Sequence, residues 1–257
     1  MSLTFPSPIF GPVHSRRLGI SLGINLLPGD GKLCSFDCIY CECGLNFDHH
    51  PHSKIPTREA VAQALELQLL KMQQEQTAPD VLTFAGNGEP TLHPQFAEII
   101  DDTIRLRNRY FPQAKISVLT NATQIHRPTV FDALRRVDNN ICKLDTVNST
   151  YINNVDRPQG DYDLERIIGH LTAFGTDCII QTMFLQGTFE GTDISNVSDQ
   201  YILPWLQTIE RIHPREVMIY TLDRDTPVKG LLKATPAQLD SIRDRVRDLG
   251  IPCSAAY

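Results

Sequence analysis

Three cysteines stand close together in the chain, at the spacing Cys34-x3-Cys38-x2-Cys41. Thiolate sulfur is a soft ligand that selects zinc or iron–sulfur clusters over hard cations such as Mg²⁺. Structural zinc sites usually close with four ligands from two separated pairs, whereas three further cysteines stand alone, at Cys142, Cys178 and Cys253. Three adjacent thiolates without a partner pair favour a [4Fe–4S] cube in which one iron has no cysteine ligand.

Two alternatives remain at this loop. Cys43 follows Cys41 by two residues, and if it bound iron it would complete a four-cysteine electron-transfer cluster. A zinc knuckle or a fortuitous group of cysteines is the alternative outside iron–sulfur chemistry. Seven cysteines placed at random in 257 residues would give this spacing about 0.005 times per chain, so chance is a weak explanation.

The elements that must position this loop alternate between strand and helix patterns. Apolar runs predict strands at residues 20–26, 81–85, 115–120, 140–145, 178–184 and 216–221, with a short closing strand at 251–255. Apolar stripes predict helices at about 57–76, from Pro94, at 128–137, 164–174, from about Leu203 to 212, and at 235–249. Residues 10–19 are expected to form a loop, because Gly and Pro interrupt them. This alternation predicts an α/β fold with a parallel sheet.

Polar or glycine-rich motifs follow several of the predicted strands. In parallel α/β folds, ligands bind at the carboxyl ends of the strands. We therefore expect one active site at a single edge of the sheet, built from the cysteine loop, Gly86–Pro90, Thr120-Asn121, Asp145, residues 181–184 and Thr221.

Two motifs resemble those of a known superfamily. Cys34-x3-Cys38-x-Tyr40-Cys41 resembles the cluster-binding signature of the radical S-adenosylmethionine (SAM) superfamily, and residues 86–90 (GNGEP) resemble its G-G-E-P motif. Likeness to the wyosine-synthase-like subgroup extends over nearly the whole chain, through residues 11–19 (GPVHSRRLG), 86–94 (GNGEPTLHP), 157–158 (RP) and 220–224 (YTLDR). The resemblance implies a single-domain partial (β/α)6 barrel over residues 20–257 with an N-terminal extension over residues 1–19.

The resemblance also implies how the cofactors bind. Cys34, Cys38 and Cys41 would bind three irons of a [4Fe–4S] cluster, and SAM would bind the fourth iron through its amino and carboxylate groups. Tyr40 would lie near the adenine. The remaining cofactor-binding candidates come from the G-G-E-P-like turn and the strand ends: Gly86, Asn87, Gly88, Glu89, Pro90, Thr120, Asn121, Asp145 and Gln181. Ala122 stands where the superfamily's T-N-G strand end has glycine.

By this resemblance, the protein is an enzyme that reductively cleaves SAM and abstracts hydrogen from a substrate that the sequence does not identify. The cluster would need a reductant such as flavodoxin or ferredoxin. Two alternatives are a tRNA-modifying enzyme like wyosine synthase and a non-enzymatic iron–sulfur electron carrier. The turn at residues 86–90 argues against the carrier, because a carrier has no use for a methionine-binding turn.

Composition limits the partners. The net charge of −6 gives no overall basic field, so nucleic-acid binding is disfavoured and would need a local patch. The candidates for such a patch are Arg16, Arg17, Arg105, Arg107 and Arg109. No cysteine precedes Cys34, so we expect a single cluster. No apolar run is long enough to span a membrane, and seven cysteines with three clustered fit a reducing compartment, so we expect a cytoplasmic protein.

Overall fold

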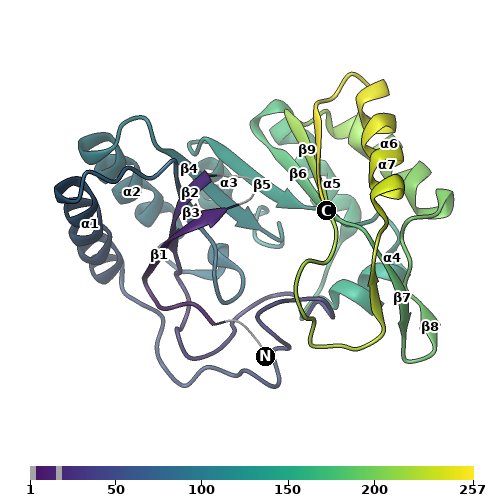
Figure 1. Ribbon diagram of the computed structural model, residues 1–257, viewed down its shortest axis with the longest axis horizontal. Helices are drawn as coiled ribbons and strands as arrows, with labels where there is room; N and C mark the ends of the chain where they lie inside the picture. The colour runs from purple at the N-terminus through teal and green to yellow at the C-terminus, as the bar shows by residue number, and fades with distance from the viewer. Residues whose placement is uncertain (1–3, 16–18) are drawn as a thin grey trace.

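A computed structural model, which describes residues 4–15 and 19–257, contains one open, curved sheet (Figure 1). Its strand order is β1 (Ile9–Ser15), β2 (Gly19–Ile24), β3 (Val81–Phe84), β4 (Lys115–Thr120), β5 (Asn139–Lys143), β6 (Ile179–Met183), β9 (Glu216–Tyr220) and β11 (Cys253–Ala256). Within this order, all neighbouring strands from β2 to β11 run parallel, and β1 runs antiparallel to β2. The predicted α/β fold and partial barrel are confirmed.

Helices follow the parallel strands and lie on the outside of the curve. They are α1 (Arg58–Gln74), α2 (Phe96–Tyr110), α3 (Pro128–Leu134), α5 (Leu164–Phe174), α6 (Asp199–Ile212) and α7 (Pro236–Asp248). Figure 1 shows α1 and α2 beside one end of the sheet and α6 and α7 beside the other, with the long loop between β2 and α1 along the lower edge. A short segment after β5 contains α4 (Ser149–Tyr151) and a π-helical turn (Ile152–Asp156). A small second sheet joins β10 (Leu231–Lys233), β7 (Leu185–Phe189) and β8 (Thr192–Asp193).

Side chains alternate between the two faces of the sheet, as the pleat requires. One set packs against the helices in the main hydrophobic core, for example Leu22, Ile24, Leu82, Phe84, Ile116 and Val118. The other set faces inward and is smaller or more polar, for example Ser21, Gly23, Thr83 and Gln181. The inner face of the sheet is therefore left open for a ligand.

Most helix boundaries agree with the signals in the sequence. Thr57 caps α1 by accepting a hydrogen bond from the Ala60 amide, and Thr235 forms a capping box with Gln238 at the start of α7. Gly175 ends α5, as predicted. Trp205 is 1% exposed in the core, and Cys142 and Cys178 are fully buried.

Several predictions about boundaries are wrong. Residues 10–19 were expected to form a loop, but β1 occupies residues 9–15, because a register shift between Phe10 and Val13 absorbs the Gly-Pro interruption and allows β1 to cover the edge of β2. Helix α6 begins at Asp199 and not near Leu203, since burial of its apolar stripe outweighs the hydrogen bond that Pro204 cannot donate. Helix α2 begins at Phe96 after a 3-10 turn, and α3 ends at Leu134.

Arg16 and Arg17, candidates for an anion-binding patch, lie outside the described residues. Within the described ranges, no helix combines the length and the apolar character needed to cross a bilayer.

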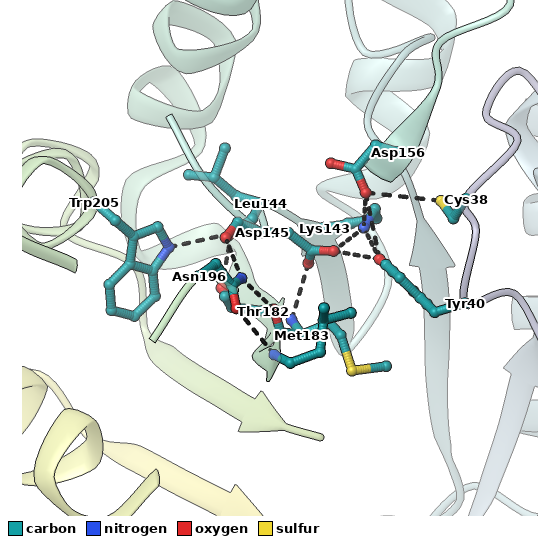
Figure 2. A network of polar contacts seen from close by, with 11 residues as sticks. Cys38, Tyr40, Lys143, Leu144, Asp145, Asp156, Thr182, Met183, Asn196 and Trp205 are labelled. Carbon is teal, nitrogen blue, oxygen red and sulfur yellow. Dashed lines mark hydrogen bonds and ion pairs between the residues drawn. The ribbon is translucent and has the colours of Figure 1, made fainter. Parts of the chain in front are cut away.

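Trp205 connects helix α6 to the end of β5, where Asp145 lies (Figure 2). Its indole Nε1 donates to the Leu144 carbonyl at 3.1 Å. We expect Trp205→Phe to lower the free energy of unfolding by about 1–3 kcal/mol, because the variant loses a buried hydrogen bond and part of a packed ring. Chemical denaturation measures this, with the exposed Leu203→Ala substitution on the same helix as control. Equal stability of Trp205→Phe and the unaltered protein would contradict the assignment.

Candidate functional site

The cysteine loop is held on one side by the turn at residues 86–90. The Leu33 amide donates to the Asn87 carbonyl at 2.8 Å, and the Glu89 amide donates to the Leu33 carbonyl at 3.1 Å. Gly88 has a φ of +134°, and a Cβ placed on it would lie 1.8 Å from the Leu33 oxygen. Only glycine therefore permits this backbone contact.

On its other side the loop is held by the π-helical turn and the residues just after it. The Asp37 amide donates to the Asp156 carbonyl at 3.0 Å, and the Ile39 amide donates to the Val155 carbonyl at 2.9 Å. Phe36 forms an isolated bridge with Pro158. Ile39 and Tyr40 are buried in a second apolar cluster beneath the loop. Backbone contacts thus fix the loop from both sides, and two buried side chains fix it from below.

Cys34, Cys38 and Cys41 are half-buried thiols, none of them in a disulfide. Within the described residues, no three Cys, His, Asp or Glu side chains converge closely enough to hold one metal ion. That geometry does not suit a mononuclear zinc site. It is compatible with a cube, because each cysteine then binds a different iron and the sulfurs need not meet at one point. The donor set and its spacing fit a cluster.

Lys32 is a buried lysine inside this loop that the sequence reasoning missed. Burial by itself would lower its pKa, but the charges of Cys41, Cys34, Cys38 and Asp37 raise that pKa above its ordinary value. The three thiols thus face a common region next to one ammonium group. No feature of the sequence pattern distinguished Lys32 from a surface lysine.

Cys43 lies beside Cys41 and also contacts the turn. Its thiol donates to the Gly86 carbonyl at 3.3 Å. The neighbouring Cys43 side chain, opposed by burial and helped by Lys32, lowers the pKa of the Cys41 thiol. Burial raises the pKa of Cys34 to about 12. Cys43 therefore connects the cysteine loop to the turn at Gly86.

Two side chains in the turn have structural partners. The Asn87 amide is fully buried, where it accepts from the Phe5 amide at 2.8 Å and donates to the Pro28 carbonyl at 2.8 Å. The Glu89 carboxylate accepts from Thr120 Oγ1 at 2.7 Å and from the Asn121 amide at 2.6 Å, and burial raises its pKa. Glu89 thus joins the turn to the end of β4. Both side chains are therefore engaged by partners within the protein.

Asn121 extends from the end of β4 to the cysteine loop. Its side-chain amide donates to Ser35 Oγ at 3.0 Å and lies 3.7 Å from Cys34 Sγ. Ala122 has a φ of +64°, the left-handed conformation that favours the glycine found there in the T-N-G pattern. The predicted candidates Thr120 and Asn121 are thus brought beside the cluster loop.

A buried polar network surrounds Tyr40 (Figure 2). The Tyr40 hydroxyl donates to Asp145, and the Lys143 ammonium donates to Tyr40, to Asp145 and, at 2.8 Å, to Asp156. Asp145 also accepts from the Met183 amide at 2.9 Å, which ties the end of β5 to the end of β6. Cys38 Sγ lies 3.8 Å from Asp156. The network therefore links the predicted residues Tyr40 and Asp145, through Asp156, to Cys38 of the cysteine loop.

The charge state of Lys143 in this network depends on its two neighbouring carboxylates. Burial alone would lower the pKa of Lys143, but Asp145 and Asp156 raise it well above its usual value. Burial raises the pKa of Asp156 to about 6, against the opposing charge of Lys143. Lys143 is therefore held as an ammonium ion. Sequence reasoning missed Lys143 and Asp156, although a lysine between Cys142 and Leu144 in a predicted strand was a visible signal for the first.

A cavity of about 450 Å³ opens on the inner face of the sheet. Polar groups on its wall are Ser21, Thr83 and Gln181, and apolar ones include Phe5, Phe10, Leu119, Ile141 and Met218. Glu42 and Arg224, an ion pair at 2.6 Å, also line the cavity. Gln181 thus faces the cavity, whereas Thr221 is buried and accepts from the Ala234 amide at 2.8 Å.

Comparison with protein families matches residues 30–192 to the Radical SAM superfamily. This range contains the cysteine loop, the turn at residues 86–90 and the network around Tyr40. Among curated proteins, a UPF0026 protein from Synechocystis sp. is 30% identical over 240 residues, covering 91% of this chain and 82% of that protein.

Solved structures show the same fold. A radical SAM methyltransferase from Sphaerobacter thermophilus has a TM-score of 0.67 at 14% identity, over 92% of this chain and 66% of that one. A structure of TYW1 with a lysine–pyruvate adduct bound has a TM-score of 0.60 at 14% identity, over 89% of this chain and 73% of that one. At these identities the likeness concerns the fold alone.

Gly88 provides a test of the contact between loop and turn. We expect Gly88→Ala to lower the free energy of unfolding by more than about 2 kcal/mol, because the new Cβ meets the Leu33 oxygen at a backbone conformation that disfavours alanine. Gly169 lies on the exposed side of α5, and a Cβ added there would meet no atom within 4 Å. Gly169→Ala should therefore raise the free energy of unfolding by about 0.5–1 kcal/mol. Thermal and urea unfolding measure both. A Gly88→Ala protein as stable as the unaltered one would refute the close contact.

Proposed function

The chain belongs to the radical SAM superfamily and to the UPF0026 family, and from this premise we propose an enzyme that cleaves SAM at a [4Fe–4S] cluster and abstracts hydrogen from a substrate in the inner cavity. Superfamily membership supports radical SAM chemistry in general and the two cofactors. The observation that carries the proposal is the three-cysteine loop bonded to the turn at residues 86–90, with its fourth cysteine, Cys43, engaged by Gly86.

Cys34, Cys38 and Cys41 are the proposed ligands of three cluster irons. The turn of Gly86, Asn87, Gly88, Glu89 and Pro90 is proposed to hold the methionine part of SAM, as its resemblance to the G-G-E-P motif implies. When both cofactors are bound, the reduced cluster supplies the electron that cleaves the SAM sulfonium to methionine and a 5′-deoxyadenosyl radical. An external reductant, of the flavodoxin or ferredoxin kind, is the proposed electron source.

The strand ends are proposed to orient SAM relative to the cavity. Tyr40 and Asp145 are fixed by Lys143, so their positions are set before a ligand arrives. Asn121 and Thr120 lie on the opposite side of the loop, held by Ser35 and Glu89. Gln181 faces the cavity and is proposed to contact the cofactor or the substrate next to it.

A tRNA-modifying, wyosine-synthase-like function is the second candidate. Residues 11–19 and 86–94 and the fold of TYW1 favour it. The acidic net charge disfavours binding to a polyanion. The observations therefore favour a different substrate.

The electron-carrier alternative requires a fourth cluster ligand. Cys43 is the nearest further cysteine in sequence, and its thiol donates to Gly86. Cys142, Cys178 and Cys253 are buried in the main core. The loop therefore fits an enzyme, whose fourth iron has no cysteine ligand, better than an electron carrier.

We expect the anaerobically reconstituted protein to contain one cluster, with about four irons per chain. Alanine at Cys34, Cys38 or Cys41 should remove the brown absorption near about 400–420 nm, because each variant loses one iron ligand. Cys253→Ala, at a buried cysteine far along the chain, serves as the control and should keep it. Zinc without iron would contradict the cluster assignment, and about eight irons would contradict a single cluster.

We expect the dithionite-reduced protein to convert SAM to 5′-deoxyadenosine, measured by liquid chromatography. Cys43→Ala should retain this activity, because Cys43 donates a hydrogen bond and binds no iron. Cys41→Ala should fall to background. Loss of cleavage in Cys43→Ala with its cluster intact would show that the ligand assignment is wrong, and turnover that depends on added tRNA would favour the second candidate.

A further inference from the structure

Lys32 is enclosed in the cysteine loop although it carries a charge. Its side chain is 1% exposed, and its ammonium donates to the Gly44 carbonyl at 2.7 Å. Gly44 follows Cys41 by three residues, and Lys32 precedes Cys34 by two. The Lys32 side chain therefore connects the segment before the first cysteine of the loop to the residue Gly44 beyond the last one. A buried ammonium is unfavourable unless opposite charge lies near it.

Asp37, the carboxylate beside Lys32, only partly balances the charge of the ammonium. Asp37 Oδ1 lies 3.5 Å from the ammonium and accepts a hydrogen bond from the Asn46 amide at 2.7 Å. Its other oxygen lies 3.6 Å from Arg157. Two cations thus share this one carboxylate, and of the two only Lys32 is fully buried, since the Arg157 side chain is 36% exposed.

The other side of the loop carries more negative than positive charge. There Lys143 lies between two carboxylates, Asp145 and Asp156, and Asp156 is 3.8 Å from Cys38 Sγ. One cation with two anions leaves a net negative charge. Lys32, and not Lys143, is therefore the cation whose charge is available to a group bound by the three cysteines.

We propose that Lys32 is a positioning residue whose buried charge offsets the negative charge of the cluster and raises its reduction potential. The inference rests on the proposed function, because it takes Cys34, Cys38 and Cys41 as the cluster ligands. Reduction adds one negative charge to the cluster. A nearby cation in a water-poor environment stabilises the reduced state more than the oxidised one. Lys32 thus makes a cluster with three anionic ligands easier for a donor protein to reduce.

The test is a potentiometric titration of the reconstituted protein without SAM, followed by electron paramagnetic resonance of the reduced cluster. Lys32→Gln removes the charge and keeps an amide that can donate to Gly44. Asp37→Asn removes the shared negative charge in a side chain of the same shape. Lys71→Gln removes the same charge as the first variant from an exposed site, 63% exposed on α1, and serves as the control.

We expect the midpoint potential of Lys32→Gln to become more negative, that of Asp37→Asn to become less negative, and that of Lys71→Gln to equal that of the unaltered protein. An unchanged midpoint in a Lys32→Gln protein with a full iron content would overturn the inference. A Lys32→Gln protein that folds, by circular dichroism, but binds no cluster would also overturn it, since Lys32 would then serve assembly. Absence of a cluster from the unaltered protein would instead remove the proposed function itself.

Discussion

The backbone of Leu33 rests directly on Gly88, and the arrangement of the site depends on this contact. It is close enough that a single Cβ at position 88 would overlap the Leu33 oxygen. The contact fixes the cysteine loop to the turn that follows β3, and Glu89 carries the connection on to Thr120 and Asn121 after β4. Segments distant in sequence thereby share one edge of the sheet, where ligands of parallel α/β folds bind.

A second constraint is electrostatic. The loop gathers three thiols in a largely buried region, where uncompensated negative charge is unfavourable. Lys32 and Lys143 lie on either side, and the carboxylates Asp37, Asp145 and Asp156 hold them in place. The same groups that make the loop stable thus define the electrostatic field in which a cluster would work. Structure and redox behaviour are linked through a few charged residues.

The cavity follows from the way the sheet divides its side chains. Many large apolar residues of the strands point outward and build the core with the helices, whereas small or polar residues such as Ser21, Gly23 and Thr83 leave space on the inner face. Phe5 and Phe10, which lie 4.5 Å apart between ring centroids, form part of its wall from the N-terminal segment. Asn87 binds the backbone of Phe5, so the turn beside the cysteine loop also fixes this wall. The turn at residues 86–90 and the cavity wall are therefore directly connected.

The sequence by itself determined the chemistry and the class of fold. Thiolate spacing at Cys34, Cys38 and Cys41 limits the metal, and period-2 and period-3.6 apolar patterns specify strands and helices, because both are local properties of the chain. It did not predict β1, whose pairing with β2 depends on a bulge, nor the roles of Lys32, Lys143 and Asp156. Only the tertiary structure decided those roles. The role of a buried lysine depends on the charges packed around it, and these come from residues far away in the sequence.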